Sequence, residues 1–214
     1  DDKLAVWAVN NKGGYTLTNQ KFEAYGLDEK RGYFTSVLSS PMPEGVYTYY
    51  CSYPAPTSVN GTVLGFHLPS EQDGKASGGA DIMVATPVSH GALTALPEVE
   101  DHSSMSLEMN RMMHQFRFYL PEGYFDVGEE LEEITFTMPQ NIAGTVTADF
   151  SDPAAPMTLG NGTRTMTLNL SDPIGESASL DDASFACAAV FPYDGAYTGS
   201  DYMQLVAYSH SYKA

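Results

Sequence analysis

The stretch Ser58-Val59-Asn60-Gly61-Thr62-Val63 places an Asn-Gly pair between alternating apolar and polar residues. The stretch Leu159-Gly160-Asn161-Gly162-Thr163-Arg164 repeats this arrangement in the second half of the chain. Asn and Gly tolerate the two positive φ angles of a type I′ turn, which joins antiparallel strands through a two-residue loop. Both stretches therefore predict a β-hairpin. Each also contains an Asn-x-Thr sequon, but the turn explains these residues without a glycosylating host.

The same alternation continues along most of the chain. Segments rich in Thr, Val, Tyr and Phe are separated by Gly, Pro, Asn and Asp at intervals of about 8 to 12 residues, a spacing typical of β-sandwiches rather than βαβ units. We therefore expect an all-β protein. The segments that predict strands are residues 4–8, 46–51, 82–85, 116–120, 134–138, 146–150, 166–170 and 205–208.

Residues 107–116 depart from this alternation. Met109, Met112, Met113 and Phe116 follow the spacing of a helical stripe before alternation resumes. A bulged strand and a short helical turn both fit, and we favour one long, irregular element that begins a second domain. Residues 87–104 are irregular and contain two prolines, so we place the domain boundary there and expect domains at 1–90 and 91–214.

The charge of the chain excludes some partners. Its 214 residues include 10 basic and 27 acidic side chains, which give a net charge of -17 and a pI near 4.3. Residues 1–31 contain five side chains of each sign, so the whole excess lies in residues 32–214. A surface of this sign repels phosphate backbones and anionic lipids, so nucleic acid is not an expected partner.

The sequence contains no membrane-spanning stretch, no signal peptide and no required disulfide. No stretch reaches the roughly 18 consecutive apolar residues that a transmembrane helix needs. The chain begins with Asp1-Asp2-Lys3 and has no signal peptide, which indicates a mature or trimmed form of a longer protein. Cys51 and Cys187 both lie in strand-like runs, and we interpret them as buried free thiols. A disulfide between them is a second reading that no spacing demands.

A search for catalytic and metal-binding motifs finds none. The sequence has no Gly-x-Ser-x-Gly, His-Glu-x-x-His or Gly-x-Gly-x-x-Gly motif. The glutamates at 129–130 and 132–133 are adjacent in pairs, whereas glycosidases hold two carboxylates apart across a cleft, so we read them as a solvated acidic flank. Five histidines are scattered singly, at His67, His90, His102, His114 and His210. We predict a non-enzymatic protein with no catalytic residue, no metal site and no cofactor.

Arg111, His114 and Arg117 recur at a spacing of three within an otherwise acidic chain. They could form a small cationic site for a carboxylate or an anionic sugar. Balance against neighbouring acidic side chains explains them as well, and we favour that interpretation.

The run from Tyr47 to Tyr53 contains four tyrosines, which could stack on sugars. Strand alternation, however, places Tyr47, Tyr49 and Cys51 on one face and Tyr50 on the other. Some of these rings must therefore belong to the core.

The order of five loose motifs resembles the fimbrillins of Bacteroidetes, which are the shaft, tip and anchor subunits of type V pili. The motifs are Lys3-Leu4-Ala5-Val6-Trp7-Ala8-Val9, the aromatic run Tyr47-Thr48-Tyr49-Tyr50-Cys51-Ser52-Tyr53-Pro54, Phe66-His67-Leu68-Pro69-Ser70-Glu71-Gln72, Asp81-Ile82-Met83-Val84-Ala85, and Arg111-Met112-Met113-His114-Gln115-Phe116-Arg117-Phe118.

This resemblance implies two transthyretin-like β-sandwich domains in tandem. It also implies export through the periplasm and the outer membrane as a lipoprotein, and polymerisation on the cell surface by strand donation. The family's lipobox and the strand before residue 3 are missing from this sequence, and the chain stops soon after Tyr208. The expected lipid anchor to the outer membrane is therefore absent from this chain.

A β-sandwich that lacks an edge strand exposes unpaired backbone groups beside an apolar groove, which another chain can complete. We expect the groove of the first domain beside Leu4, Val6 and Ala8. The expected donor lies near the C-terminus and includes Met203, Leu205 and Ala207. In the family's scheme a trypsin-like protease frees the groove, and Arg31 in the dibasic pair Lys30-Arg31 is a candidate cleavage site.

The sequence thus predicts a structural or adhesive subunit of extracellular cell-surface fimbriae, assembled by donor-strand complementation. Its expected partners are other pilin subunits and a host or bacterial surface protein or glycan. The shaft, tip and anchor roles are equally compatible with these residues. The alternative is a surface-exposed glycan-binding lipoprotein with a β-sandwich fold.

Overall fold

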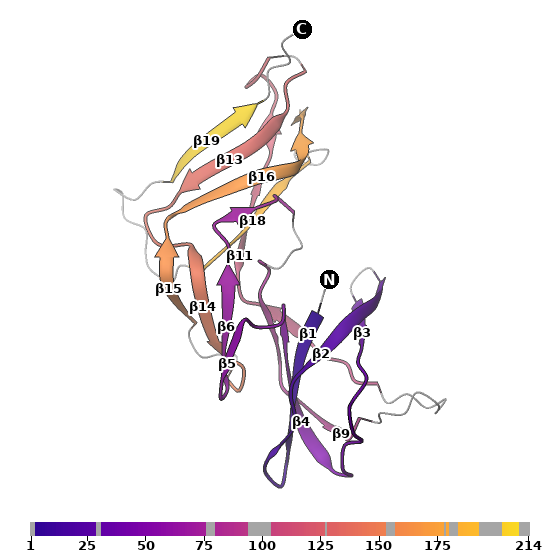
Figure 1. The fold of residues 1–214 in the computed structure, drawn as a ribbon. Helices are drawn as coiled ribbons and strands as arrows, with labels where there is room; N and C mark the ends of the chain where they lie inside the picture. The colour runs from indigo at the N-terminus through magenta and orange to yellow at the C-terminus, as the bar shows by residue number, and fades with distance from the viewer. Residues whose placement is uncertain are drawn as a thin grey trace. The chain divides into compact units, whose positions relative to one another are not determined.

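The computed structural model describes residues 3–28, 31–75, 80–93, 104–126, 128–152, 157–177, 179, 184–192 and 203–209. Every regular element in these residues is a β-strand, as Figure 1 shows. The prediction of an all-β fold is therefore confirmed. No helix among the described residues is long and apolar enough to cross a membrane. The finer prediction of tandem transthyretin-like sandwiches stays a prediction.

The chain forms two compact units built from alternating segments. Unit 1 consists of residues 1–65, 82–112 and 148–157, and unit 2 of residues 66–81, 113–147 and 158–214. Strands β6 (Val63–Leu68) and β14 (Ala143–Asp149) each continue from one unit into the other. The expected domains at 1–90 and 91–214 stay a prediction.

Unit 1 contains a seven-stranded sheet with the order β10-β8-β4-β1-β2-β3, in which β9 also pairs with β4. Strands β8 and β9 share one edge of β4, and β1 occupies the other. The strands of unit 1 are β1 (Lys3–Asn10), β2 (Tyr15–Asp28), β3 (Arg31–Thr35), β4 (Val46–Tyr53), β5 (Ser58–Asn60), β8 (Met83–Ala85), β9 (Val88–Gly91) and β10 (Met109–Arg111).

Strand β1 is buried on both faces. Residues 4–8 are all buried, although simple alternation predicts only every second one. On one face, the Trp7 ring stacks on Phe150 with centroids 4.8 Å apart. Tyr50 of the neighbouring β4 packs on the same Phe150 ring at 5.0 Å. The uninterrupted apolar run of residues 4–9 is the local pattern of a strand buried on both faces, but only the structure shows that Phe150, far along the chain, covers the second face.

The tyrosine run forms one side of the core, as alternation predicts. Tyr47, Tyr49 and Cys51 of β4 are fully buried, whereas Tyr50 is partly exposed. The two buried hydroxyls donate hydrogen bonds to backbone carbonyls, Tyr47 to Pro43 at 2.7 Å and Tyr49 to Gly91 at 2.8 Å. These two rings are therefore core residues and not a sugar-stacking platform.

Both cysteines are buried free thiols, which confirms the interpretation from sequence. Cys51 belongs to unit 1 and Cys187 to unit 2. Burial raises the pKa of the Cys51 thiol to about 12, so this thiol stays protonated and unreactive at neutral pH.

Unit 2 contains a four-stranded sheet with the order β19-β13-β16-β7, the antiparallel pair β11–β18 and the parallel pair β12–β17. Phe136 of β13 contacts the rings of Phe116 and Phe118 of β11, with centroid distances of 6.0 and 5.2 Å. The further strands of unit 2 are β7 (Glu71–Gln72), β11 (His114–Phe118), β12 (Leu120–Pro121), β13 (Leu131–Thr137), β15 (Thr158–Thr163), β16 (Thr165–Ile174), β17 (Glu176–Ser177), β18 (Ala186–Val190) and β19 (Gln204–Ser209).

The Gln72 side chain joins two of these sheets. Its strand β7 pairs in parallel with β16, and its side chain reaches β18. Gln72 Nε2 donates to the carbonyl of Ala189 at 2.8 Å, and the Ala189 amide donates back to Gln72 Oε1 at 2.9 Å. This amide satisfies both backbone groups of a buried residue on the edge of β18 that faces away from β11. The Gln of the third family-like motif therefore has a structural role.

The first predicted hairpin is confirmed, with its turn moved by one residue. Strand β5 ends at Asn60, which pairs with Val63 of β6, so the loop is Gly61-Thr62. Gly61 has a φ of 61°, and Asn60 is not among the residues with positive φ. The type I′ turn centred on Asn60-Gly61 is therefore wrong, although the hairpin itself forms.

The second predicted hairpin is wrong, because Asn161 and Gly162 lie inside β15. Their strand pairs with β14 through Ala143↔Thr163 and Thr145↔Gly160, so three steps along β15 face two along β14. Such an irregularity is a β-bulge, and Asn161 adopts a φ of 50° there. The Asn-Gly pair tolerates a bulge for the same reason that it tolerates a turn.

The irregular segment near residue 110 contains no helix. It forms β10, which pairs with β8 in unit 1, and β11, which pairs with β18 in unit 2, with a bend at Met113 between them. The helical turn is therefore wrong, and the expected single element is divided into two strands that belong to different units. Met113, between the two strands, is 3% exposed and explains why the apolar spacing shifts at this point.

We expect Gly144→Ala to destabilise the protein by about 1–3 kcal/mol, because φ at Gly144 is 148° and a Cβ would meet the Gly160 oxygen at 2.8 Å. The matched control is Gly175→Ala, which meets nothing within 4 Å and should change stability by about 0.5 kcal/mol or less. Urea unfolding of both variants measures the difference. Equal midpoints would contradict the assigned bulge geometry.

We expect Gln72→Ala to lower stability by about 1–3 kcal/mol, since it leaves both backbone groups of the 7%-exposed Ala189 without their partner. Gln72→Glu keeps the acceptor but loses the donor to the Ala189 carbonyl, and it should also destabilise. The exposed Gln204→Ala serves as the control in the same urea titration. Equal urea midpoints for Gln72→Ala and Gln204→Ala would show that Gln72 does not stabilise the contact between β7 and β18.

Candidate subunit interface

Leu4, Val6 and Ala8, the residues expected to flank an open groove, lie in the middle of a sheet. Their exposures are 8%, 2% and 0%. Strand β1 pairs with β2 on one edge and with β4 on the other. Both hydrogen-bonding edges of β1 are therefore occupied within the single chain. A strand from another subunit could lie directly beside β1 only after β2 or β4 had left.

The free edge on this side of the sheet belongs to β2. Residues 15–23 of β2 pair with β1, and residues 23–28 pair with β3. Among the described strands, none pairs with residues 17–22 on the side away from β1. This stretch presents backbone groups to which a further strand could add.

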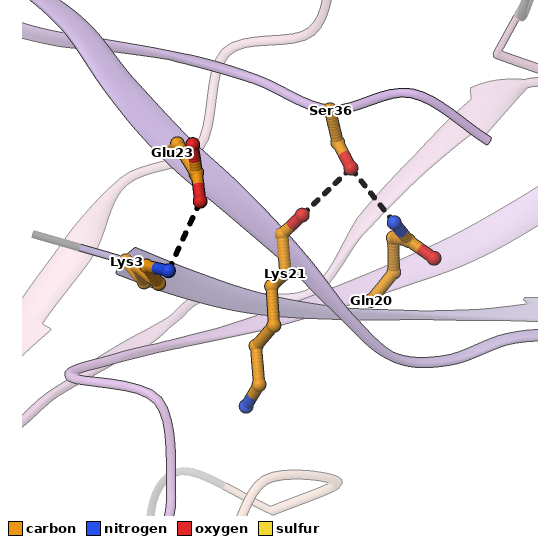
Figure 2. Close-up of polar contacts among 5 residues, drawn as sticks. All are labelled: Lys3, Gln20, Lys21, Glu23 and Ser36. Atoms are coloured by element: carbon orange, nitrogen blue, oxygen red, sulfur yellow. Dashed lines mark hydrogen bonds and ion pairs between the residues drawn. The ribbon is translucent and has the colours of Figure 1, made fainter.

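Side chains rather than a strand cover part of this edge, as Figure 2 shows. The Ser36 hydroxyl donates to the carbonyl of Lys21 at 2.6 Å. Gln20 Nε2 donates to the Ser36 hydroxyl at 2.7 Å and reaches the Val37 carbonyl at 3.5 Å. Individual hydrogen bonds of this kind contribute about 0.5–1.5 kcal/mol each, so an incoming ladder of backbone bonds could replace them.

A bulge and Lys21 mark the same edge. Asn19 has a φ of 54°, and the register jumps from Val6↔Gln20 to Ala8↔Leu17 around it. Lys21 Nζ donates to Asn19 Oδ1 at 2.8 Å. Partial burial and then the nearby Lys3 ammonium lower the pKa of Lys21. Bulges and lysines are common devices against uncontrolled pairing at a sheet edge.

The Lys3–Glu23 ion pair, also in Figure 2, joins β1 to β2 across the ladder with 3.0 Å between Nζ and Oε1. Its side chains are 40% and 68% exposed. An exposed pair of this kind contributes about 0–1 kcal/mol, whereas burying one large apolar side chain contributes about 1.5–3 kcal/mol. The core side chains of β1, and not this ion pair, therefore hold β1 in the sheet.

Strand β19, the expected donor region, is an edge strand of unit 2. It pairs with β13 alone among the described strands, and Figure 1 shows it in yellow beside β13. Residues 203–208 are all exposed, including Met203 and Leu205 at 44% each and Ala207. Residues 203–208 thus belong to the sheet through backbone pairing of β19, while their large apolar side chains remain 38–50% exposed.

Two of the exposed residues of β19, Leu205 and Ala207, lie on the face of the sheet that should pack against the core. Leu205 lies opposite Phe136, and Ala207 lies opposite Ile134. Residues directly opposite each other in an antiparallel pair point to the same face of the sheet. Phe136 and Ile134 are 0% and 1% exposed, yet Leu205 remains 44% exposed. The core-facing row of β19 therefore has little covering it.

Arg31, the candidate cleavage residue, is the first residue of β3 and is exposed. It pairs with Asp28 at the end of the β2–β3 hairpin. The preceding Lys30 lies outside the described residues. A cut after Arg31 would separate both β1 and β2 from the rest of the chain, and β1 is the most deeply buried strand of its sheet.

The cationic triplet does not form one site. Arg111 lies in β10 of unit 1, whereas His114 and Arg117 lie in β11 of unit 2. Because His114 and Arg117 are three residues apart in a strand, their side chains point to opposite faces. A spacing of three brings side chains to the same face of a helix but to opposite faces of a strand.

Other candidate groups in the described part of the chain are structural. No group of three or more His, Cys, Asp or Glu there could hold a metal ion. Glu129 Oε2 accepts a hydrogen bond from the Ser209 hydroxyl at 3.1 Å, which ties the end of β19 to unit 2. Glu176 accepts hydrogen bonds from the backbone amides of Phe125 and Tyr124. Hydrogen bonds from backbone amides, with that of Phe125 the largest cause, lower the pKa of Glu176.

Two pairs of exposed aromatic rings were not predicted from the sequence. Tyr25 and Tyr33, on β2 and β3, are 69% and 41% exposed, with ring centroids 6.0 Å apart. Tyr119 and Phe185 are each 37% exposed, with centroids 6.3 Å apart. Nothing in the sequence distinguishes these rings from the buried tyrosines of β4, because exposure depends on what covers each strand.

Comparison with known proteins identifies the fold. No family model and no curated protein matches the sequence. The fold is similar to that of a "putative cell adhesion protein" from Bacteroides uniformis ATCC 8492, with a TM-score of 0.59 and 15% identity over 97% of this chain and 77% of that chain. A second, from Bacteroides ovatus ATCC 8483, gives a TM-score of 0.56 and 11% identity over 98% and 75%. The likeness is one of fold and covers nearly the whole chain.

We expect the double variant Leu205→Lys, Ala207→Lys to fold with a stability within about 1 kcal/mol of the parent, because both residues are exposed and long lysine side chains can reach water from them. Phe136→Lys, directly opposite Leu205, places a charge at a fully buried position and should unfold unit 2. Circular dichroism and urea titration measure both effects. Unfolding of the double variant would show that β19 covers more core than its exposure indicates.

Proposed function

We propose that this chain is a non-enzymatic structural or adhesive subunit of cell-surface fimbriae, in which a strand of one subunit completes a sheet of the next. The observation that carries the proposal is the edge strand β19, which is paired on one side and exposed on both faces. A strand held mainly by backbone hydrogen bonds exchanges at lower cost than one that anchors a core.

The fold likeness supports a role in adhesion. Two structures that share this fold over three quarters of their length carry the description of cell adhesion proteins. A shared fold alone hosts many functions, so β19 and the free edge of β2 provide the further support for assembly. The proposed location is the outer cell surface after export, and the proposed partners are other pilin subunits.

The acceptor would be the β1–β2 side of unit 1. Because Leu4, Val6 and Ala8 are already covered by β2, an incoming strand either adds to the free edge of β2 at residues 17–22 or replaces β2 beside β1. We favour addition to β2, since only side-chain bonds from Ser36 and Gln20 must break. Cleavage after Arg31 is not needed for this route.

We expect Leu205→Lys, Ala207→Lys to abolish filament formation while the monomer stays folded, since the charged side chains would have to enter the apolar interface of an acceptor sheet. The matched control is Val63→Lys, Tyr124→Lys, which adds the same charge at two exposed apolar residues outside β19 and β2. Immunogold electron microscopy of producing cells, with an antibody against this chain, measures assembly.

Label along filaments in the parent and the control, but not in the β19 variant, is the expected result. Label at filament ends or bases would assign a tip or anchor subunit. Normal filaments from the β19 variant would refute β19 as the donor. Label on the cell surface without filaments in the parent would refute assembly and favour the alternative, a glycan-binding surface lipoprotein.

A further inference from the structure

Unit 2 contains an open pocket of about 550 Å³ that has no part in the proposed strand exchange. Its rim carries four charged side chains, Asp73, Lys75, Arg117 and Asp172, and the aromatic ring of Phe185. Its floor includes Ala186 and Cys187 of β18, which are 1% and 5% exposed. Pockets of a few hundred Å³ with an apolar floor and a few polar groups are typical of small-ligand sites.

The floor of the pocket is held rigidly. The amide of Cys187 donates to the carbonyl of Gly74 at 2.7 Å, and the amide of Ser171 donates to the carbonyl of Asp73 at 3.3 Å. Gly74 has a φ of 78°, and a Cβ there would clash with the side chain of Leu170. The backbone of residues 73–74 is therefore hydrogen-bonded to both β16 and β18.

The rim offers donors and acceptors in equal number. Lys75 Nζ lies 3.4 Å from Asp172 Oδ2 in an exposed ion pair, and Asp73 Oδ1 accepts a bond from the Lys75 amide at 3.0 Å. The Arg117 guanidinium lies 5.8 Å from the centroid of the Phe185 ring. Among the described residues no carboxylate lies within ion-pair distance of Arg117, so its N–H donors are available to a ligand.

The balance of charge selects the class of ligand. Two cations and two carboxylates leave the rim neutral, and the chain as a whole carries a net charge of -17. Phosphates, sulfates and acidic sugars would therefore be repelled on approach. A hydroxyl group both donates and accepts a hydrogen bond, so a polyhydroxyl compound without charge uses all four side chains.

An aromatic face completes this chemistry. Phe185 is 37% exposed, and the equally exposed Tyr119 packs against it with centroids 6.3 Å apart. The C–H face of a sugar ring is apolar while its rim carries hydroxyls, which matches an aromatic ring beside charged donors and acceptors. The pair Tyr25–Tyr33 in unit 1 also has exposed rings, but these rings do not line this pocket.

We propose that this pocket binds a neutral sugar residue of a glycan. Phe185 stacks on the ring, Arg117 and Lys75 donate to its hydroxyls, and Asp73 and Asp172 accept from them. The inference rests on the proposed location at a cell surface, where glycans are available, but not on filament assembly. It gives an adhesive subunit a ligand class that strand exchange alone does not supply.

The test titrates the folded full chain with methyl glycosides of glucose, galactose, mannose and N-acetylglucosamine, and with methyl glucuronide as the acidic probe, by ligand-observed and protein-observed NMR. We expect at least one neutral glycoside to bind in the millimolar range and the glucuronide to bind more weakly. Phe185→Ala and Arg117→Gln should each weaken binding about tenfold or more. The control Tyr25→Ala, which removes the most exposed ring of the other pair, should leave binding unchanged.

Three results would overturn the proposal: no binding of any neutral glycoside, tighter binding of the glucuronide, or equal loss in the Tyr25→Ala control. Circular dichroism of each variant shows whether a loss comes from unfolding, and Arg117→Lys, which keeps the charge, should restore part of the affinity. The Leu205→Lys, Ala207→Lys variant should still bind sugar. Failure of sugar binding with intact filaments would therefore refute the pocket and leave the assembly proposal standing.

Discussion

The position of β1 is the constraint on which unit 1 depends. Residues 4–8 are buried on both faces, and both edges of the strand are paired. A buried backbone group without a hydrogen-bond partner is costly, so β2 and β4 must both remain in register beside β1. The stacking of Trp7 on Phe150 adds a contact between residues 143 positions apart and closes the second face. The sheet is therefore organised around a strand that a partner cannot reach directly.

Strand β19, in contrast to β1, has exposed side chains and one unpaired edge among the described strands. It is paired on one side only among the described strands, and residues 203–208 are exposed. Elements with few buried contacts open at low free-energy cost, and functional rearrangements use such elements. Within the same unit, β18 is buried along its whole length, and the Gln72 amide satisfies both backbone groups of Ala189 on its second edge. The two strands differ in how completely their edges are covered, and this difference supports the proposal that β19 is the exchangeable strand.

The proposed assembly surface and the proposed sugar pocket use different physical interactions. Strand exchange depends on backbone hydrogen bonds and apolar side chains, whereas the pocket depends on Phe185 beside a neutral set of four charged groups. The net charge of -17 opposes anionic ligands at any surface but places no restriction on neutral ones. A subunit could therefore polymerise and hold a glycan without one process blocking the other.

The sequence by itself determined the all-β class and the buried face of Tyr47, Tyr49 and Cys51, because alternation is a local property of a strand. It did not determine β2 (Tyr15–Asp28), which no expected strand segment covers, or whether Asn161-Gly162 forms a turn or a bulge, since both tolerate the same dihedral angles. Nor did it determine that the distant Phe150 covers the second face of β1. The sequence also did not predict that the side chains of β19 and Phe185 are exposed. Whether an apolar residue is core or interface depends on what lies opposite it, and only the tertiary structure decides that.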